Sequence, residues 1–363
     1  MNWLEVRGLG DVDSPGLLVD GDLVERNIQR MIELVGGSAG LARLRPHTKT
    51  HKMPAIAKMQ VDAGISQFKA ATLAEAEMLA EAGASDVLLA HQPVGPKISR
   101  LRSLVDQYPA VRFSTIVDNI LSVGKLAEQL GSAEQPFSVF IDVDCGMHRT
   151  GIEFGDGGTQ LRDTIVAAPE LSFAGLHVYD GHLHEPALED RQRLAGEIIQ
   201  SVKDSGLLDD EITVIGGGSP TFGVWASETT WQCSPGTTLL WDHGYGNNYP
   251  DLDFSVAAAL LTRVISKPGG QRVCVDLGHK AVAAEMPLGI RVQLPGVPDA
   301  EFVGQSEEHL VFTSSLAAKL NVGDELLAIP KHICPTAALH RQAHVVRDGQ
   351  VTGDTWDVTA RDR

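Results

Sequence analysis

Short β-rich runs alternate with helical segments between about residue 40 and residue 243, and this alternation limits the fold more than any other feature. Eight such runs are present, at 41–49, 66–71, 86–91, 111–117, 137–144, 171–179, 212–217 and 237–242. The segments between them repeat apolar residues at helical spacing, as in 72–83. Strands that alternate with helices are typical of a parallel sheet, and eight units in about 200 residues predict a (β/α)8 barrel of the TIM type.

The pattern changes after about residue 245. Runs rich in β-forming residues are separated there by Gly, Pro, Asn and Asp, at 254–267, 272–278, 309–314, 324–330 and 343–351. Such runs predict an antiparallel β domain, which we expect the opening residues to join. The predicted fold is therefore α/β, with a barrel over 20–245 and a β domain formed by 1–19 together with 246–363.

Composition excludes several classes of protein. A chain of 363 residues with 43% hydrophobic residues is long and apolar enough for a globular core. A net charge of −17 without basic clusters predicts no binding to nucleic acid. The start lacks a basic segment before an apolar run, and no apolar stretch reaches membrane length, so we expect a cytoplasmic protein that binds no membrane. The four cysteines lack CxxC spacing, which predicts neither disulfides nor a zinc ribbon.

Three basic residues mark the end of the first run. Arg45, His47 and Lys49 alternate, so on a strand their side chains point to one face at the barrel mouth. Cationic neighbours favour a neutral amine, the form that attacks an aldehyde, and barrel enzymes carry catalytic residues at the C-terminal ends of strands. Lys49 is thus predicted to be a Schiff-base lysine. The alternative is a basic residue of a solvated loop, which we prefer for Lys52.

Two glycine-containing segments follow the last two predicted strands. Residues 212–222 place three glycines, a serine and a threonine after the seventh run, and 233–242 bring a Gly-Thr pair at the eighth. Exposed backbone N–H groups in such loops bind anions, and barrels bind phosphate after strands seven and eight. The alternative is a pair of tight turns. The predicted phosphate-binding residues are Gly217, Gly218, Ser219, Thr221, Gly236 and Thr237.

His332 and Cys334 lie two positions apart near the C-terminus. On an extended segment both side chains project to the same side. Imidazole and thiolate favour Zn²⁺, and a site with two protein ligands leaves positions open for water or substrate. The alternative is a buried cysteine beside a loop histidine.

The segments RPHTKTHK (45–52), ATLAEAEMLAEAG (71–83) and GGGSPT (216–221) together resemble the D-threonine aldolase and D-serine dehydratase family. Its barrel is that of the alanine racemase group, pyridoxal-phosphate (PLP) fold type III, and the likeness spans nearly the whole chain. The resemblance implies that Lys49 carries PLP. From DCGMHRTG it implies that Arg149 contacts the cofactor's ring hydroxyl, and from GLHVYDGH that Tyr179 contacts cofactor or substrate.

The resemblance also bears on the metal and on the reaction. An HxC or HxD pair at this place binds a divalent metal in the family, with HxC in the dehydratase type and HxD in the aldolase type. Zinc is the expected metal, with manganese and magnesium as alternatives. The pair here is HxC, whereas 90–98 resembles the aldolases. We therefore expect a PLP-dependent, metal-assisted lyase acting on D-3-hydroxy-amino acids.

Two reactions of this lyase stay open from the sequence. In dehydration, Lys49 removes the Cα proton and hydroxide leaves. In retro-aldol cleavage, a base such as His51 takes the proton of the 3-hydroxyl group. Rival functions are an amino-acid racemase of the alanine racemase group and a non-catalytic PLP carrier that consists of a barrel alone. The metal pair argues against the first and the additional domain against the second. The resemblance further implies a homodimer.

Overall fold

The computed structural model describes residues 3–209 and 211–362. It divides into two compact units. The first, which we call the barrel unit, contains residues 31–49 and 57–236. The second, the sheet unit, contains residues up to 30, residues 50–56 and residues 237–361.

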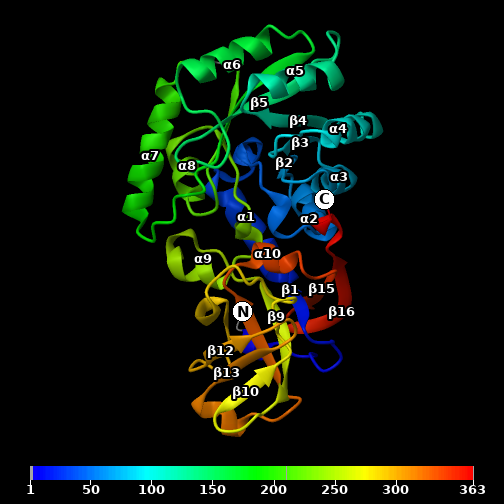
Figure 1. Ribbon diagram of the computed structural model, residues 1–363, viewed down its shortest axis with the longest axis vertical. Helices are drawn as coiled ribbons and strands as arrows, with labels where there is room; N and C mark the ends of the chain where they lie inside the picture. Colours follow the sequence, from blue (N-terminus) through cyan, green and yellow to red (C-terminus); the bar gives the residue numbers. More distant parts are fainter. Residues whose placement is uncertain (1–2, 210, 363) are drawn as a thin grey trace. The chain divides into compact units, whose positions relative to one another are not determined.

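Parallel strands form the centre of the barrel unit, and each pairs with the next one along the chain (Figure 1). They are β2 (Gln67–Ala70), β3 (Asp86–Leu89), β4 (Arg112–Val117), β5 (Phe137–Val143), β6 (Leu171–Val178), β7 (Thr213–Gly216) and β8 (Gln232–Cys233). Leu44 makes a parallel bridge to Cys233 and His47 makes one to Lys69. The segment from Leu44 to His47 therefore joins β8 to β2 and closes the barrel. The predicted barrel is confirmed.

Helices follow the strands of the barrel unit in alternation (Figure 1). Polar caps mark where some of them begin: the Thr72 hydroxyl accepts the N–H of Glu75, and the Asn119 side chain accepts that of Ser122. Buried Leu88, Ile116, Phe140 and Ile215 form a cluster contributed by four different strands. The helices are α2 (Pro54–Asp62), α3 (Leu73–Glu81), α4 (Pro96–Gln107), α5 (Ile120–Gln129), α6 (Asp156–Val166), α7 (Leu188–Asp204) and α8 (Phe222–Glu228).

Two of the eight predicted strand runs differ from the structure. The run 237–242 begins with a 3-10 helix, η4 (Thr237–Leu239), because the N–H groups of Leu240 and Trp241 bond back to the Thr237 carbonyl. The eighth strand is instead the two-residue β8, which is too short to show a period in the sequence. The run 41–49 begins with η2 (Gly37–Arg43) and ends in η3 (Thr48–Thr50), and Pro46, which lacks an N–H, lies between its two bridges.

The sheet unit contains a second sheet, in which every pairing is antiparallel except that of β1 with β15. The predicted antiparallel domain is therefore confirmed. Its core includes Leu18, Leu261, Leu327 and Val346. Its strands are β1 (Gly16–Asp20), β9 (Ala258–Ser266), β10 (Arg272–Val275), β11 (Val292–Gln293), β12 (Glu301–Gln305), β13 (Leu310–Thr313), β14 (Glu325–Pro330), β15 (Gln342–Arg347) and β16 (Gln350–Asp357).

Short helices connect these strands. Trp3, in the first of them, donates its indole N–H to the Val256 carbonyl, so the opening residues pack within the sheet unit. The longer helix α1 (Gly21–Leu34) follows β1. The others are η1 (Trp3–Glu5), α9 (His243–Asn248), η5 (Pro250–Leu252), η6 (Leu288–Ile290), η7 (Ser315–Lys319), α10 (Ile333–Ala337) and η8 (Thr359–Arg361).

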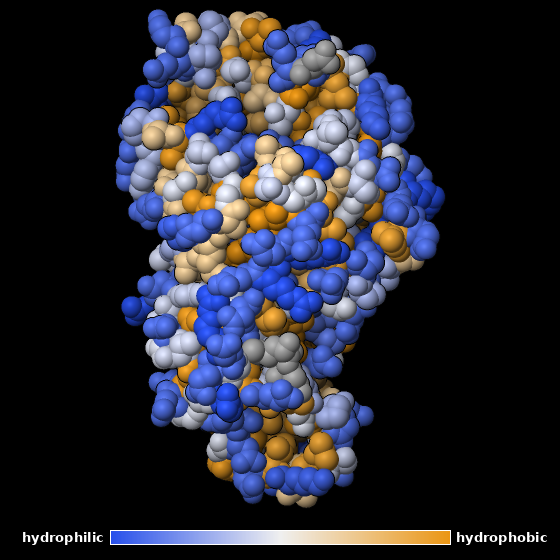
Figure 2. Space-filling view, turned by 180° about the vertical axis from the view of Figure 1, so that it is seen from behind, coloured by the Kyte–Doolittle hydropathy of each residue, from blue (hydrophilic) through white to orange (hydrophobic). Residues whose placement is uncertain are grey.

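Hydrophobic residues on the face seen in Figure 2 are interspersed with hydrophilic ones. Within the described ranges, no helix combines the length and the apolar character needed to cross a membrane. The four cysteines are free thiols, as their spacing predicts.

A buried ion pair inside the barrel unit gives a prediction about stability. Arg45 is 1% exposed and its Nη1 lies 2.6 Å from Asp86 Oδ1. Burial alone raises the pKa of Asp86, but the hydrogen bonds and charges of Arg45 and Arg112 outweigh it and lower that pKa. We expect Asp86→Asn to lower the free energy of unfolding by about 3 kcal/mol, because it leaves a buried guanidinium without its counter-ion. The measurement is urea unfolding at pH 7.

The matched control is Asp106→Asn, which removes the exposed partner of Arg102 one helical turn away and should cost less than about 1 kcal/mol. Since the folded-state pKa of Asp86 is depressed, its contribution is complete above the unfolded pKa of about 4 and disappears as the pH falls through the folded value. Equal losses in the two variants would show that the buried pair has no special weight.

Candidate functional site

Lys49 lies in η3, directly after the bridge that His47 makes with β2. Its backbone N–H donates to His47 Nδ1 at 3.2 Å, which turns the chain out of the strand. The predicted alternation of three basic side chains on one face therefore does not reach Lys49. Arg45 is also not a free cation, since Asp86 neutralises it.

The Tyr179 ring, just after β6, gathers three cationic groups of the barrel unit. Lys49 Nζ lies 5.3 Å from the ring centroid, Arg149 Cζ lies 5.3 Å from it, and Lys69 Nζ lies 5.5 Å from it. Residues from four segments far apart in sequence thus meet at one aromatic ring. Lys49, Arg149 and Tyr179 were predicted as cofactor residues from three different segments of the sequence, and the fold brings them together.

Lys69 was missed by the sequence analysis. It lies in β2, is 3% exposed, and its Nζ is 3.3 Å from His177 Nε2. His177 Nδ1 in turn lies 2.7 Å from Asp142 Oδ1. A lone lysine inside the apolar run QFKAA was the available signal, because a charged residue in a buried strand is unusual.

Burial and mutual contacts set the protonation states of Lys69, His177 and Asp142. Burial, followed by repulsion from Lys49, lowers the pKa of Lys69 to about 7. Burial and the Lys69 charge lower the pKa of His177, so its ring is neutral. Burial alone raises the pKa of Asp142, but the hydrogen bonds from His177 and from the Thr150 hydroxyl outweigh it and keep the carboxyl ionised.

The two glycine-containing segments meet in the barrel unit. The N–H of Gly236 donates to Ser219 Oγ at 3.1 Å, and that of Gly218 donates to Thr221 Oγ1 at 3.1 Å. The N–H of Gly217, whose φ is +77°, bonds to the Val178 carbonyl. An anion could replace the two hydroxyl acceptors without breaking a backbone pair. The segments thus fit a phosphate group.

Glycine is required at the start of the first segment. A Cβ on Gly216 would come within 2.0 Å of the Trp225 ring, and one on Gly217 within 2.7 Å of it. The same indole donates its N–H to Asp180 at 2.8 Å. The packing of Trp225 is therefore sufficient reason for glycine at positions 216 and 217. Glycine at these two positions is not by itself evidence for phosphate binding.

The sheet unit holds the predicted metal pair. His332 caps the start of α10 with an extended backbone, whereas Cys334 lies inside the first turn of that helix. The prediction of one extended segment is therefore wrong for Cys334. The Cys334 sulfur lies 3.1 Å from Thr50 Oγ1 and 3.4 Å from Thr237 Oγ1. Thr237, predicted as a phosphate ligand, thus directs its hydroxyl to the thiol.

The groups around this pair favour positive charge on His332 and negative charge on Cys334. His332 Nδ1 lies 2.8 Å from Glu285 Oε1, which leaves Nε2 for the thiol side. Burial alone lowers the pKa of His332, but Cys334, Asp242 and Glu285 raise it to about 9. Burial alone raises the pKa of Cys334, but its hydrogen bonds with His332, Thr237 and Thr50 lower it.

A histidine held by a carboxylate beside a thiolate suits a borderline cation. The described part of the chain contains no group of three or more His, Cys, Asp or Glu side chains able to hold a metal ion. A metal at this pair would therefore have two protein ligands and open positions.

His51, in the sheet unit, is fully buried. Its Nδ1 accepts the N–H of Met53 at 3.0 Å, and burial lowers its pKa to about 3. A neutral ring with an accepting Nδ1 carries its proton on Nε2. That nitrogen is buried, and none of the residues in 3–209 and 211–362 gives it a hydrogen-bond partner. His51 is therefore arranged as a hydrogen-bond donor, which differs from the base that we predicted.

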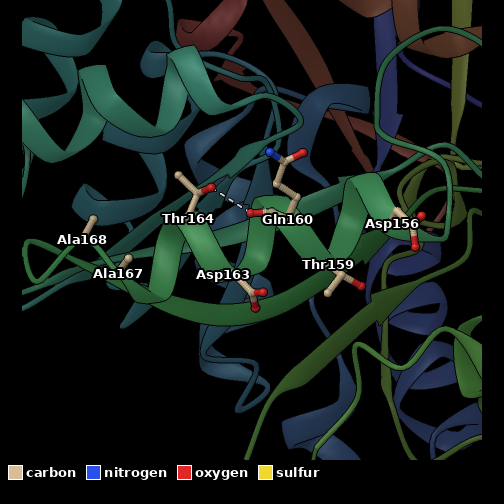
Figure 3. Close-up of a pocket in the computed structure, with 7 residues that line it drawn as sticks. All are labelled: Asp156, Thr159, Gln160, Asp163, Thr164, Ala167 and Ala168. Atoms are coloured by element: carbon tan, nitrogen blue, oxygen red, sulfur yellow. Dashed lines mark hydrogen bonds between the residues drawn. The ribbon is translucent and has the colours of Figure 1, made fainter.

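A surface hollow runs along α6 (Figure 3). Its lining is Asp156, Thr159, Gln160, Asp163, Thr164, Ala167 and Ala168. None of the predicted site residues belongs to it, and the Thr164 hydroxyl is occupied by the Gln160 carbonyl. We assign no chemistry to this hollow.

Comparison with known proteins identifies the family. Residues 19–243 match the alanine racemase N-terminal domain, and residues 257–346 match a putative serine dehydratase domain. D-threonine aldolase from an Arthrobacter species is 31% identical over 97% of this chain and 94% of its own length. The chain belongs to the D-threonine aldolase and D-serine dehydratase family. The recognition from motifs is confirmed, and with it the class of PLP-dependent lyases.

Two further members show the range of this family. D-threo-3-hydroxyaspartate dehydratase from a Delftia species is 25% identical over 95% of this chain and 97% of its own length. The crystal structure of D-threonine aldolase from Filomicrobium marinum has a TM-score of 0.87 and 30% identity, and it covers 97% of this chain and 96% of that one. The serine dehydratase match beyond the barrel counts against the racemase and carrier alternatives.

Proposed function

We propose that the protein is a metal-assisted PLP lyase that cleaves D-3-hydroxy-amino acids by a retro-aldol reaction. The observation that carries the cofactor is the gathering of Lys49 and Arg149 at the Tyr179 ring, in the unit that also contains the paired glycine segments. Cleavage is supported by the higher identity to an aldolase, 31%, than to a dehydratase, 25%.

The residues of the barrel unit fit the separate parts of the cofactor. Lys49 would hold its aldehyde carbon and Arg149 its ring hydroxyl. The phosphate would bind the amides of Gly218 and Gly236 and the hydroxyls of Ser219 and Thr221, next to the turn at Gly217. When bound, the pyridine ring supplies a sink for the electron pair that is released at the substrate Cα.

The residues of the sheet unit would hold the metal and orient the substrate oxygens. His332 and Cys334 are the proposed ligands, with zinc as the proposed ion and manganese or magnesium as alternatives. A divalent ion there supplies Lewis acidity to a hydroxyl group. The buried Nε2–H of His51 is suited to donate to a carboxylate or hydroxyl oxygen of the substrate.

Dehydration is the second candidate, and the HxC pair favours it. The resemblance gives HxC to the dehydratase type and HxD to the aldolase type, which was the reason to expect the dehydratase reaction. In that case Lys49 would take the Cα proton and the 3-hydroxyl would leave. The two candidates share every proposed ligand and differ in which bond breaks.

Product analysis separates the two reactions. Purified protein loaded with PLP and zinc is incubated with D-threonine, D-serine and D-3-hydroxyaspartate. We expect glycine together with an aldehyde. Formation of a keto acid together with ammonia would show that the reaction is dehydration rather than cleavage. Turnover of the L enantiomers alone would contradict both candidates.

We further propose a cytoplasmic homodimer that binds neither nucleic acid nor a membrane. The negative charge spread over the sequence and the family resemblance support these proposals. Light scattering of the purified protein gives the subunit number.

A further inference from the structure

Lys69 is a buried amine that the proposed function does not use. Its Nζ lies over the same Tyr179 ring as the Nζ of Lys49, at 5.5 Å and 5.3 Å from the centroid. It reaches the carboxylate of Asp142 through the His177 ring, by contacts of 3.3 Å and 2.7 Å. Asp142 also accepts the hydroxyl of Thr150, which follows Arg149. Lys69 thus shares a ring with Lys49 and is linked through Asp142 to the segment that carries Arg149.

Stability alone does not explain this lysine. A buried ammonium loses its hydration. A hydrogen bond to a neutral imidazole offsets less of that cost than a direct ion pair with a carboxylate would. Methionine has a similar length and no charge. A purely structural position would therefore favour methionine, which suggests that the amine is retained for its chemistry.

Lys49 needs a proton acceptor to perform its proposed role. A lysine attacks an aldehyde as the neutral amine, so its ammonium must first release a proton. Lys69 lies over the same ring as Lys49 and offers a neutral amine near pH 7, because burial lowers its pKa to about 7. His177, with a lowered pKa, is hydrogen-bonded to Asp142 and accepts from Lys69.

We propose that Lys69 is a positioning residue for Lys49, an amine that takes up the proton which Lys49 gives up before it bonds to an aldehyde. The transfer converts one ammonium and one amine into one amine and one ammonium. Water then leaves when the Lys49 nitrogen bonds to the aldehyde carbon, so atoms and charge balance. This inference rests on the proposed cofactor role of Lys49.

The charged and titratable groups that act on Lys69 come from several elements of the barrel unit. They are Lys49 in η3, Asp142 in β5, His177 in β6, Asp180 and Tyr179 after β6, Arg149 after β5, and Arg45 before β2. Lys49 and Arg45 disfavour the ammonium of Lys69, whereas Asp142 and Asp180 favour it. Formation of a neutral amine at Lys49 removes one repelling charge, so Lys69 holds its proton more firmly once Lys49 is neutral.

The test follows the attachment of pyridoxal 5′-phosphate to cofactor-depleted protein, by the growth of visible absorbance between pH 6 and pH 10. We expect Lys69→Met to slow attachment at pH 7 by roughly tenfold, the low end of the contribution of a positioned proton acceptor. The rates should converge near pH 10, where lysine amines lose protons to water. Lys125→Met, which changes a lysine 64% exposed on α5, is the matched control and should leave the profile unchanged.

Lys69→Arg separates proton transfer from charge. A guanidinium keeps the positive charge but does not give up its proton, so this variant should be as slow as Lys69→Met. Normal attachment in Lys69→Arg would show that charge alone is needed, and normal attachment in Lys69→Met would show that Lys69 is not needed; either result overturns the inference. Urea unfolding checks the fold, and we expect Lys69→Met to be at least as stable as the parent.

A second measurement needs no cofactor. Acetic anhydride labels neutral amines, and peptide mass spectrometry reports the labelling of Lys49 at each pH. Slower labelling of Lys49 at pH 7 in Lys69→Met is expected, and equal labelling contradicts the inference. If pyridoxal phosphate attaches elsewhere than Lys49 in the parent protein, the proposed function fails, while this measurement still decides the role of Lys69.

Discussion

Lys49→Ala is expected to abolish the visible absorbance of PLP-loaded protein and to lower turnover of D-threonine by at least about 10³-fold, or ~4 kcal/mol in activation free energy. The reason is that the lysine amine is the proposed covalent anchor of the cofactor and the proposed group that moves protons at the substrate Cα. Visible absorbance is measured before reduction; the protein is then treated with borohydride and dialysed, and the modified peptide is identified by mass spectrometry.

Lys52→Ala is the matched control for this variant. Lys52 is three positions further along, and its Nζ donates to the Ala360 carbonyl within the sheet unit. Its removal should leave both absorbance and turnover within about twofold of the parent. If Lys49→Ala still retains bound, reduced cofactor after dialysis, another amine is the anchor, and Lys69 is the first to examine because it contacts the same ring.

The fold was predictable where its pattern is local. Each strand or helix is indicated by the spacing of apolar residues within a short segment. For example, α3 (Leu73–Glu81) lies inside the helical segment predicted at 72–83. The errors fall where long-range contacts decide. β8 has two residues and exists because Cys233 meets both Gly216 and Leu44, far away in the chain. The segment 237–242 has the composition of a strand, but residues 44–47 already bridge β8 and β2, and the segment begins with a helical turn.

Candidate site residues could be named from the sequence where each lies in a local motif. Lys49, Arg149 and Tyr179 each lie in a recognisable segment, and the structure adds that one ring brings them together. Lys69 was not predictable in the same way. Its partner His177 is 108 positions further along, and the importance of the pair depends on burial in the barrel, which no local pattern reports. The role of His51 depends on which of its ring nitrogens accepts the Met53 N–H, and the sequence does not determine this.

Cys334→Ala and His332→Ala are each expected to release the bound metal and to lower turnover by about 10³-fold, while the visible absorbance of the cofactor stays near that of the parent. A lost ligand leaves one protein donor, which is too few to retain a divalent ion against chelation. Metal content is measured by plasma mass spectrometry after dialysis against EDTA. Cys274→Ala, a buried thiol in β10, is the matched control and should keep its metal.

Cys334→Asp carries the argument one step further, because it replaces a soft ligand by a hard one at the same position. Carboxylate oxygen prefers manganese and magnesium more than thiolate does, so the variant should retain a metal but shift its preference away from zinc. If the thiolate also favours departure of the 3-hydroxyl group, the ratio of aldehyde to keto acid should rise in this variant. An unchanged ratio together with a changed metal would show that the groups around Lys49, rather than the metal ligands, select the bond that breaks.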